Sequence, residues 1–345
     1  MGNGKPVLPI MQGGMGVGIS RSRLAGSVAG CGGIGIISTA QIGYDEPGFD
    51  NDPKSCNRKA IEKHIKKAKE ISGGNGLVGV NVMHALQDYK EHVITAASAG
   101  ADIIVCGAGL ANDLPELVKG TSALIAPIVS SRKAADVITK MWSRHYDRLP
   151  DLIVIEGPLA GGHLGFRREA LDDIGHMDFD SEIRSIIEFV RSVEKNSAHH
   201  IPVFAAGGIS DRTSADHAFS LGADGIQVAT RFVATAECDA ADSYKQAYVN
   251  AAPEDVCIIK SPVGMPGRAL NNAFIKTVSA CPVHPSRCYR CISSCDPAAA
   301  PYCITDALIK AVRGDTENGL VFCGANVGAV DRISSVPEVI SELIG

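Results

Sequence analysis

Residues 201–231 read IPVFAAGGISDRTSADHAFSLGADGIQVATR, and this stretch contains one complete repeat of the pattern that decides the fold. An apolar run at 203–206 precedes two glycines, an amphipathic segment at 211–220 and a second apolar run at 226–229. Both runs are too short for a helix and have the continuous hydrophobicity of strands covered on both faces. Asp211 stands where a helix N-cap is expected. The stretch predicts a strand–helix–strand unit of a parallel sheet.

The same unit recurs along most of the 345 residues. Eight apolar runs are predicted strands: 7–11, 33–37, 77–82, 103–106, 124–129, 152–155, 203–206 and 226–229. Amphipathic segments lie between them, at 20–29, 58–71, 88–99, 113–118, 132–144, 181–194 and 211–220. Ser20 and Asp113 are two further expected N-caps. Residues 51–57 are expected to form a loop. Eight units favour an α/β protein with a closed (β/α)8 TIM barrel over an open sheet.

The pattern stops after the eighth run. Residues 238–315 are polar, interrupted by proline and rich in cysteine, which predicts a smaller Cys-rich lid subdomain over the barrel mouth. The predicted division is therefore a barrel at 1–237, a lid or cap at 238–315 and a segment at 316–345 that closes the barrel. A last helix is expected at 336–344.

Composition excludes several classes of partner. The net charge is −5 and aromatic residues make up 5%, which argues against nucleic acids and anionic membranes. No apolar stretch approaches the roughly 18 residues of a membrane span. Residues 1–6 carry no apolar leader, and the 11 cysteines are then expected to be reduced. These features predict a cytoplasmic protein with a small-molecule substrate; a homodimer is left open.

The active site of such a barrel is built from the loops that follow its strands. Glycines follow the first, fourth, sixth and seventh runs, and they allow a large flat ligand to approach the backbone. Gly207 and Gly208 follow the seventh run, while Ala229 and Thr230 end the eighth. Loops at these two positions commonly bind phosphate through backbone N–H groups. The alternative is that the glycines only make turns, and the pair of correctly placed loops favours a phosphate site.

His163 follows two glycines after the sixth run. An imidazole there would point into the barrel mouth and titrate near neutrality, which suits proton transfer at a substrate carbon. The alternative is a loop histidine bonded to backbone. His84 is a weaker candidate from the third run. Residues 14–18 lack the glycine spacing of a dinucleotide-binding motif, so a Rossmann fold is rejected.

Together these residues resemble the nitronate monooxygenase family of FMN barrels, which also contains flavin-type enoyl-acyl-carrier-protein reductases and certain NAD(P)H:quinone reductases. The matching stretches are 9–15, 24–35, 79–81, 156–163, 205–209 and 222–232, with weaker likeness at 262–275 and 319–328. Two positions depart from the family pattern. Leu159 replaces a common Glu near His163, and Ala229 replaces a common Gly in the phosphate turn.

The resemblance implies FMN in the barrel mouth and His163 as the catalytic residue, a base in the monooxygenases. The residues that it assigns to the cofactor are Gln12, Gly13, Gly14, Met15, Asn81, Glu156, Gly161, Gly162, Gly207, Gly208, Gln227, Ala229 and Thr230. The first four would lie beside the isoalloxazine, and the last ones would hold the phosphate.

Five cysteines crowd into the predicted lid. Six, two, three and seven residues separate Cys281, Cys288, Cys291, Cys295 and Cys303. Thiolates at this density are typical of iron–sulfur or zinc sites, so a metal is predicted, with iron–sulfur ahead of zinc. The alternative is a metal-free loop of reduced or redox-labile thiols.

Three functions follow from the sequence. The first is an FMN-dependent oxidoreductase that oxidises alkyl nitronates with O2, with His163 as base. The second is a reductase that uses NAD(P)H and FMN to reduce an enoyl thioester or a quinone. The third is a non-catalytic sensor of a phosphate-bearing ligand.

Overall fold

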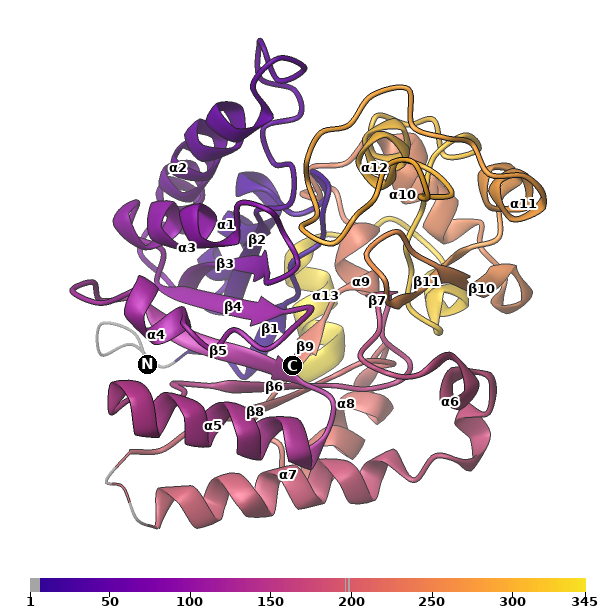
Figure 1. Ribbon diagram of the computed structural model, residues 1–345. Coiled ribbons are helices and arrows are strands. Elements are labelled where there is room, and N and C mark those ends of the chain that lie inside the picture. The colour runs from indigo at the N-terminus through magenta and orange to yellow at the C-terminus, as the bar shows by residue number, and fades with distance from the viewer. Residues whose placement is uncertain (1–6, 196, 198) are drawn as a thin grey trace.

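The computed structural model describes residues 7–195, 197 and 199–345, and its centre is a closed barrel of eight parallel strands (Figure 1). Strand β9 pairs with β1, with Met11 opposite Gln227, and this pairing closes the ring. The barrel strands, in order around the ring, are β1 (Ile10–Gln12), β2 (Ile34–Ser38), β3 (Leu77–Met83), β4 (Ile103–Gly107), β5 (Leu124–Val129), β6 (Ile153–Glu156), β8 (Val203–Ala206) and β9 (Gly225–Val228). The predicted (β/α)8 barrel is confirmed.

Helices surround the barrel strands. They are α1 (Ser22–Gly30), α2 (Pro53–Ser72), α3 (Tyr89–Ser98), α4 (Leu114–Leu117), α5 (Arg132–Tyr146), α6 (Arg168–Asp172), α7 (Phe179–Glu194), α8 (Arg212–Ser220), α9 (Thr230–Val233) and α13 (Val336–Ile344). Helix α8 begins at the predicted cap, where the Asp211 carboxylate accepts the Ser214 N–H and Ser214 bonds back. Helix α13 contacts α8 and α1, so the last segment of the chain packs on the barrel wall.

Two local predictions were wrong for identifiable reasons. The expected loop at 51–57 is largely helix, because Pro53 occupies the first turn of α2 and Asp52 accepts the Ser55 N–H. Ser20 does not cap α1; its hydroxyl bonds instead with the backbone of Met15. Asp113 stands at the predicted N-cap position of α4, but its side chain forms no capping hydrogen bond.

The barrel interior is a closed apolar core. Side chains that include Met11, Ile36, Val105 and Phe204 fill it from strands around the ring. A second layer lies between strands and helices, and it is tightest at Gly35, where an added Cβ would lie 1.8 Å from the Ala25 carbonyl oxygen. Glycine at this position lets α1 rest directly on β2.

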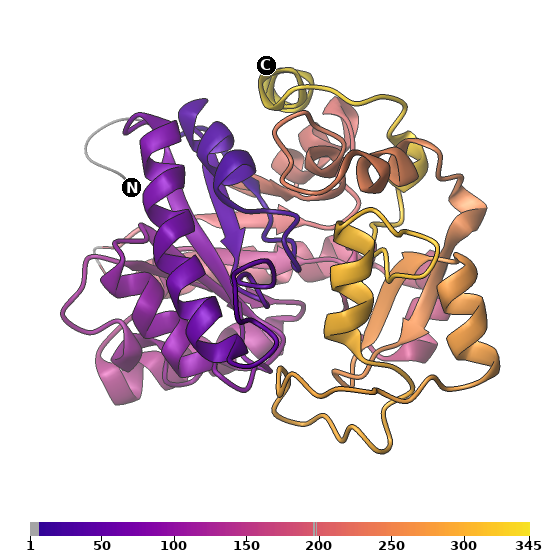
Figure 2. The same cartoon turned by 90° about the horizontal axis from the view of Figure 1, so that it is seen from above.

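The chain beyond α9 builds a small unit beside the barrel (Figure 2). It contains α10 (Asp242–Val249), β10 (Val256–Lys260), β11 (Pro266–Leu270), α11 (Ala273–Ala280) and α12 (Ile304–Val312). Strand β7 (Gly162–His163), from the loop after β6, joins β11 and β10 in an antiparallel sheet. Short 3₁₀ turns lie at η1 (Ile174–His176), η2 (Pro253–Asp255) and η3 (Val327–Ala329). The shared sheet ties this unit to the barrel mouth, and the boundaries at 238–315 and 316–345 stay predictions.

The predicted metal site is not supported. Cys281, Cys288, Cys291, Cys295 and Cys303 are free thiols, and no group of three potential ligands in the described residues is arranged to hold a metal. Cys281 and Cys303 lie at the ends of two different helices, α11 and α12, and the others lie on the loop between. Burial raises the pKa of Cys291 to about 11, which favours the thiol over the metal-binding thiolate.

No helix in the described ranges combines the length and the apolar character that a membrane crossing requires. The predicted lack of a leader concerns residues 1–6, which lie outside the described residues.

Candidate active site

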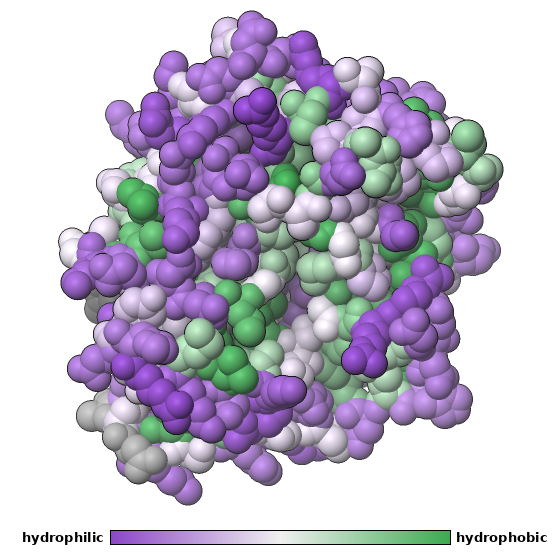
Figure 3. Space-filling view, in the orientation of Figure 1, coloured by the Kyte–Doolittle hydropathy of each residue, from purple (hydrophilic) through white to green (hydrophobic). Residues whose placement is uncertain are grey.

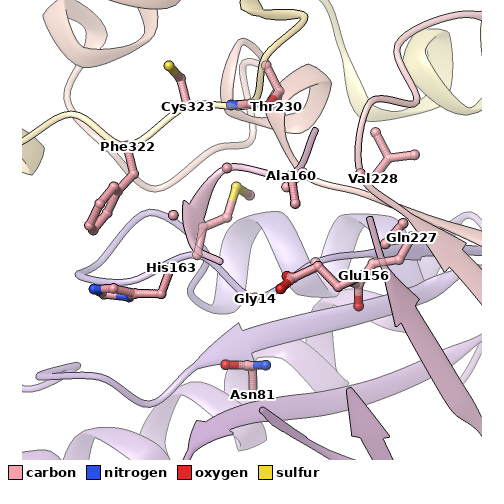
Figure 4. A pocket seen from close by; sticks show the side chains of 18 of the residues that line it. Gly14, Asn81, Glu156, Ala160, His163, Gln227, Val228, Thr230, Phe322 and Cys323 are labelled. Atoms are coloured by element: carbon pink, nitrogen blue, oxygen red, sulfur yellow. Dashed lines mark hydrogen bonds between the residues drawn. The ribbon is translucent and has the colours of Figure 1, made fainter. Parts of the chain in front are cut away.

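A cavity opens at the end of the barrel where the strands finish, and it is bounded by the strand-end loops and the segment at 322–326 (Figure 4). In the space-filling view, apolar residues gather around a hollow on this face (Figure 3). The predicted site residues that line the cavity are Gly13, Gly14, Met15, Asn81, Glu156, Gly161, Gly162, His163, Gly207, Gly208, Gln227, Ala229 and Thr230. The structure therefore brings together every predicted site residue of the barrel except Gln12.

The Gln12 side chain has a structural role between two barrel strands. It is fully buried, and its amide oxygen accepts the N–H of Ile36 at 3.1 Å while its amide nitrogen donates to the Ile36 carbonyl at 3.1 Å. These bonds occupy its polar atoms and tie β1 to β2. Gln12 thus supports the strand end that carries Gly13 and Gly14 and does not itself line the cavity.

One end of the cavity is a cradle of backbone amides. Gly207 and Gly208 adopt left-handed φ angles of 96° and 83°, and a Cβ added to Gly208 would lie 2.8 Å from the Leu159 side chain. Within the described ranges the N–H groups of Gly208 and Thr230 donate to no protein acceptor. Free N–H groups around a space that only glycine leaves open are suited to an anion such as phosphate.

Helix α8 supplies no described residue to the cavity lining. Asp211 caps α8 and accepts the Ser214 N–H, so a carboxylate already occupies the N-terminus of that helix. The free N–H groups of the cradle therefore belong to the loops.

A segment near the end of the chain completes the cradle, and the sequence analysis missed it. Asn326 donates its side-chain amide to the Gly208 carbonyl at 2.6 Å, and the Gly324 N–H donates to the Thr230 hydroxyl at 3.1 Å. At Gly161 an added Cβ would lie 2.6 Å from the Cys323 backbone, so the two loops touch. The weak family likeness at 319–328 was the available signal.

The opposite end of the cavity has apolar walls. Its other lining side chains, which the sequence analysis did not single out, include Met83, Ala108, Ile128, Leu308 and Phe322. No lysine or arginine of the described chain lines the cavity. Arg268 is buried and donates to the carbonyl of Ala160, where it supports the loop that carries His163. His84 packs on Tyr89 and does not line the cavity.

Glu156 is the cavity's carboxyl group. Glu156 ends β6, and its carboxyl group has no hydrogen-bond partner in the described part of the chain. Burial raises the pKa of Glu156 to about 7 because no charged neighbour offsets the loss of solvation. The carboxyl group therefore exchanges its proton near neutral pH and can donate a hydrogen bond in its acidic form.

His163 lies on β7 at the edge of the cavity, beside Phe322 (Figure 4). The two rings meet edge to face with centroids 5.0 Å apart, and the His163 Nε2 lies 2.7 Å from the Ser261 hydroxyl oxygen. Burial lowers the pKa of His163 to about 4, so its imidazole is neutral at physiological pH. Leu159, at the place of the family's common Glu, packs toward Gly208.

The sequence and the fold that carry this site are similar to those of known proteins. The family model described as nitronate monooxygenase matches residues 4–345. The chain belongs to the nitronate monooxygenase family. A probable nitronate monooxygenase of Staphylococcus aureus (strain JH9) is 24% identical over 314 residues, which cover 79% of this chain and 77% of that protein.

Other relatives carry different names. A dehydrogenase of Rhodococcus jostii that acts on a hydroxy-methyl-oxo-octahydroindene-carboxyl-CoA is 24% identical over 270 residues, 78% of this chain. The match spans 64% of that relative's length, just under two thirds.

Solved structures share the fold over nearly the whole chain. FabK from Thermotoga maritima has a TM-score of 0.74 and 25% identity, with 97% of this chain and 91% of that chain covered. A nitroalkane oxidase from Streptomyces ansochromogenes has a TM-score of 0.71 and 19% identity, with 98% and 94% covered. Membership of the nitronate monooxygenase family identifies the protein as an enzyme of the oxidoreductase class.

Proposed function

We propose that the protein is an FMN-dependent oxidoreductase and that FMN lies along the cavity. The observation that carries this proposal is the cradle of free amides at Gly208 and Thr230, which leaves room for a phosphate and offers it several donors. Asn81 and Glu156 would meet the polar edge of the flavin or its ribityl chain, and Gly13, Gly14 and Met15 would lie beside its rings. Bound there, FMN accepts electrons from a donor substrate and passes them to an acceptor.

Glycine at position 14 fits this placement. A Cβ added to Gly14 would lie 2.4 Å from the Asn81 side chain and 3.1 Å from Ile36. Glycine at position 14 therefore lets the end of β1 pack directly against Asn81, another residue of the cavity lining.

The favoured reaction is the oxidation of an alkyl nitronate with O2. The family model and the Staphylococcus aureus relative carry this name. The apolar side chains of Met83, Ile128 and Phe322 would contact the alkyl group and exclude water. His163 would meet the reacting end of the substrate, where the sequence analysis places a base.

The second candidate is an NAD(P)H-dependent reductase of enoyl thioesters or quinones. It is favoured by the likeness to FabK over 97% of the chain. An uncharged acyl chain would also suit a cavity without lysine or arginine in its described lining. Both candidates use the same flavin cradle, and they differ in the electron donor.

Anaerobic reduction of the bound flavin separates the two candidates. A nitronate should bleach the flavin absorbance within the turnover time, and NADH or NADPH should do so far more slowly. Rapid bleaching by NAD(P)H with no response to nitronates would establish the reductase. The variant His163→Ala should retain FMN and lose turnover by a factor of about 10² or more. Unchanged turnover would remove His163 from the mechanism.

A further inference from the structure

The hydroxyl group of Ser261 sits against the imidazole of His163. Ser261 lies in the turn between β10 and β11, is 3% exposed, and places its oxygen 2.7 Å from His163 Nε2. The same oxygen accepts the Val263 N–H at 3.3 Å. β11 pairs with β7, with Gly267 opposite His163, so the turn and the histidine belong to one sheet. The contact therefore joins the unit beyond the barrel directly to the site.

The direction of this hydrogen bond follows from the available partners. A serine hydroxyl has one hydrogen to donate, and its oxygen already receives the Val263 N–H. In the described part of the chain, His163 Nε2 is the acceptor within hydrogen-bond distance of that hydroxyl. If Nε2 carried the hydrogen instead, the buried hydroxyl hydrogen would have no acceptor, which is unfavourable. The arrangement that gives both the hydrogen and the oxygen of the Ser261 hydroxyl group a partner has Ser261 donating to Nε2.

The other ring nitrogen is then fixed by elimination. Burial keeps the ring neutral, because it lowers the pKa of His163 to about 4. A neutral ring that accepts at Nε2 carries its hydrogen on Nδ1. No described residue forms a hydrogen bond with Nδ1, and the ring lines the cavity. Phe322 packs edge-on against the ring and restricts its rotation.

We infer that Ser261 is a positioning residue, which holds His163 in the Nδ1–H form so that the imidazole donates a hydrogen bond to an oxygen atom of the substrate. The inference rests on the proposed function in placing substrate beside His163. The shared chemistry is a negatively charged oxygen atom: a nitronate oxygen carries the charge in the bound substrate, and a thioester carbonyl oxygen gains it during reduction. His163 then acts as a donor, and the base that the sequence analysis predicts is not needed for a nitronate, which is already deprotonated.

The tautomer can be measured without turnover. Long-range proton–nitrogen correlation spectra of the flavin-loaded, 15N-histidine-labelled protein distinguish Nδ1–H from Nε2–H, and His163→Gln identifies the signals. We expect Nδ1–H in the native protein and loss of this preference in Ser261→Ala. Ser261→Thr keeps the hydroxyl group and should restore it. Nε2–H in the native protein, or an unchanged tautomer in Ser261→Ala, would overturn the inference.

A matched control is Ser72→Ala in α2, because Ser72 is 4% exposed and also bonds to backbone. It should leave the His163 signals unchanged. In turnover, Ser261→Ala should lower kcat/KM about tenfold, a smaller loss than removal of a whole oxyanion donor. An unchanged kcat/KM would contradict the donor role. If neither nitronates nor NAD(P)H reduce the flavin, the proposed reactions fail, while the tautomer result still decides the role of Ser261.

Discussion

At the scale of single residues, the proposed phosphate cradle depends most directly on glycine at position 208. Its φ of 83° is unfavourable for any side chain, and a Cβ would meet Leu159 at 2.8 Å. We expect Gly208→Ala to weaken FMN binding at least tenfold, because the methyl group displaces Leu159 or the loop that presents the free N–H. Titration of the flavin-free protein with FMN measures this effect.

Gly120→Ala is the control for backbone strain. Gly120 has a φ of 80°, and an added Cβ meets nothing within 4 Å. Both variants should lose about 1–2 kcal/mol of stability from the left-handed backbone, and only Gly208→Ala should lose FMN affinity. Equal FMN affinity in the two variants would show that phosphate does not bind at Gly208.

Glu156 gives a pH dependence whose sign follows from its raised pKa. Its pKa is about 7 in the folded protein against an ordinary 4.5, so the folded state holds the proton more tightly. The contribution of Glu156 to stability is therefore lost as the pH rises from about 4.5 to about 7. In the flavin-free protein, Glu156→Gln should gain up to about 3 kcal/mol over the native protein at pH 8 and little at pH 4.5.

Urea unfolding at several pH values tests this prediction. The difference between variant and native protein isolates Glu156 from other titrating groups. Glu116→Gln, at an exposed position of α4 outside the cavity, is the control for the replacement of a carboxyl group by an amide. A flat difference for Glu156→Gln would mean that the carboxyl group is solvated.

At the scale of elements, helix α3 buries the polar side chain of His92 between the helix and its neighbours. His92 is 4% exposed, and neither of its ring nitrogens has a hydrogen-bond partner among the described residues. Burial lowers its pKa to about 4, so the folded state resists protonation of the imidazole and loses stability as the pH falls from 6.5 toward 4. His92→Leu should raise the free energy of unfolding by about 1–3 kcal/mol and by more at pH 5 than at pH 8.

Thermal unfolding of the variant at these two pH values measures the gain. His145→Leu changes an exposed histidine on α5 and is the control for the replacement of an imidazole by an apolar side chain. A loss of stability in His92→Leu would show that water or another donor satisfies the imidazole.

Most elements could be predicted from sequence because the apolar runs and the helical periodicity carry the same information as the packing. Strands β5 and β8 coincide with their predicted ranges, and the other barrel strands differ by one to three residues at an end. Capping was less predictable. Asp211 faces its own helix, whereas Ser20 finds a competing partner in the backbone of Met15.

At the scale of the whole molecule, the barrel and its strand-end loops were predictable, while contributions from distant chain segments were not. Asn326 and Phe322 reach the cavity from beyond the Cys-rich stretch, where no repeating pattern indicates their direction. Gln12 lies at the end of a barrel strand, as a cavity residue should, but its side-chain amide forms hydrogen bonds with the backbone of β2. The five cysteines are close together in sequence, but among the described residues the fold does not bring three potential ligands together around one point.

The unit beyond the barrel also explains why the site is closed on one side. Its sheet includes β7, which carries His163, and its turn supplies Ser261. The position of His163 thus depends on a contact with Ser261, which is 98 positions further along the chain. Such a long-range contact follows from the topology and has no local sequence signal.

The central claim is that the barrel mouth holds FMN, and the visible absorption spectrum of the purified protein tests it most directly. We predict the two-band spectrum of a bound flavin, with one FMN released per chain on denaturation and with anaerobic bleaching by a nitronate. A colourless protein that takes up no FMN when the cofactor is supplied in excess would contradict the account.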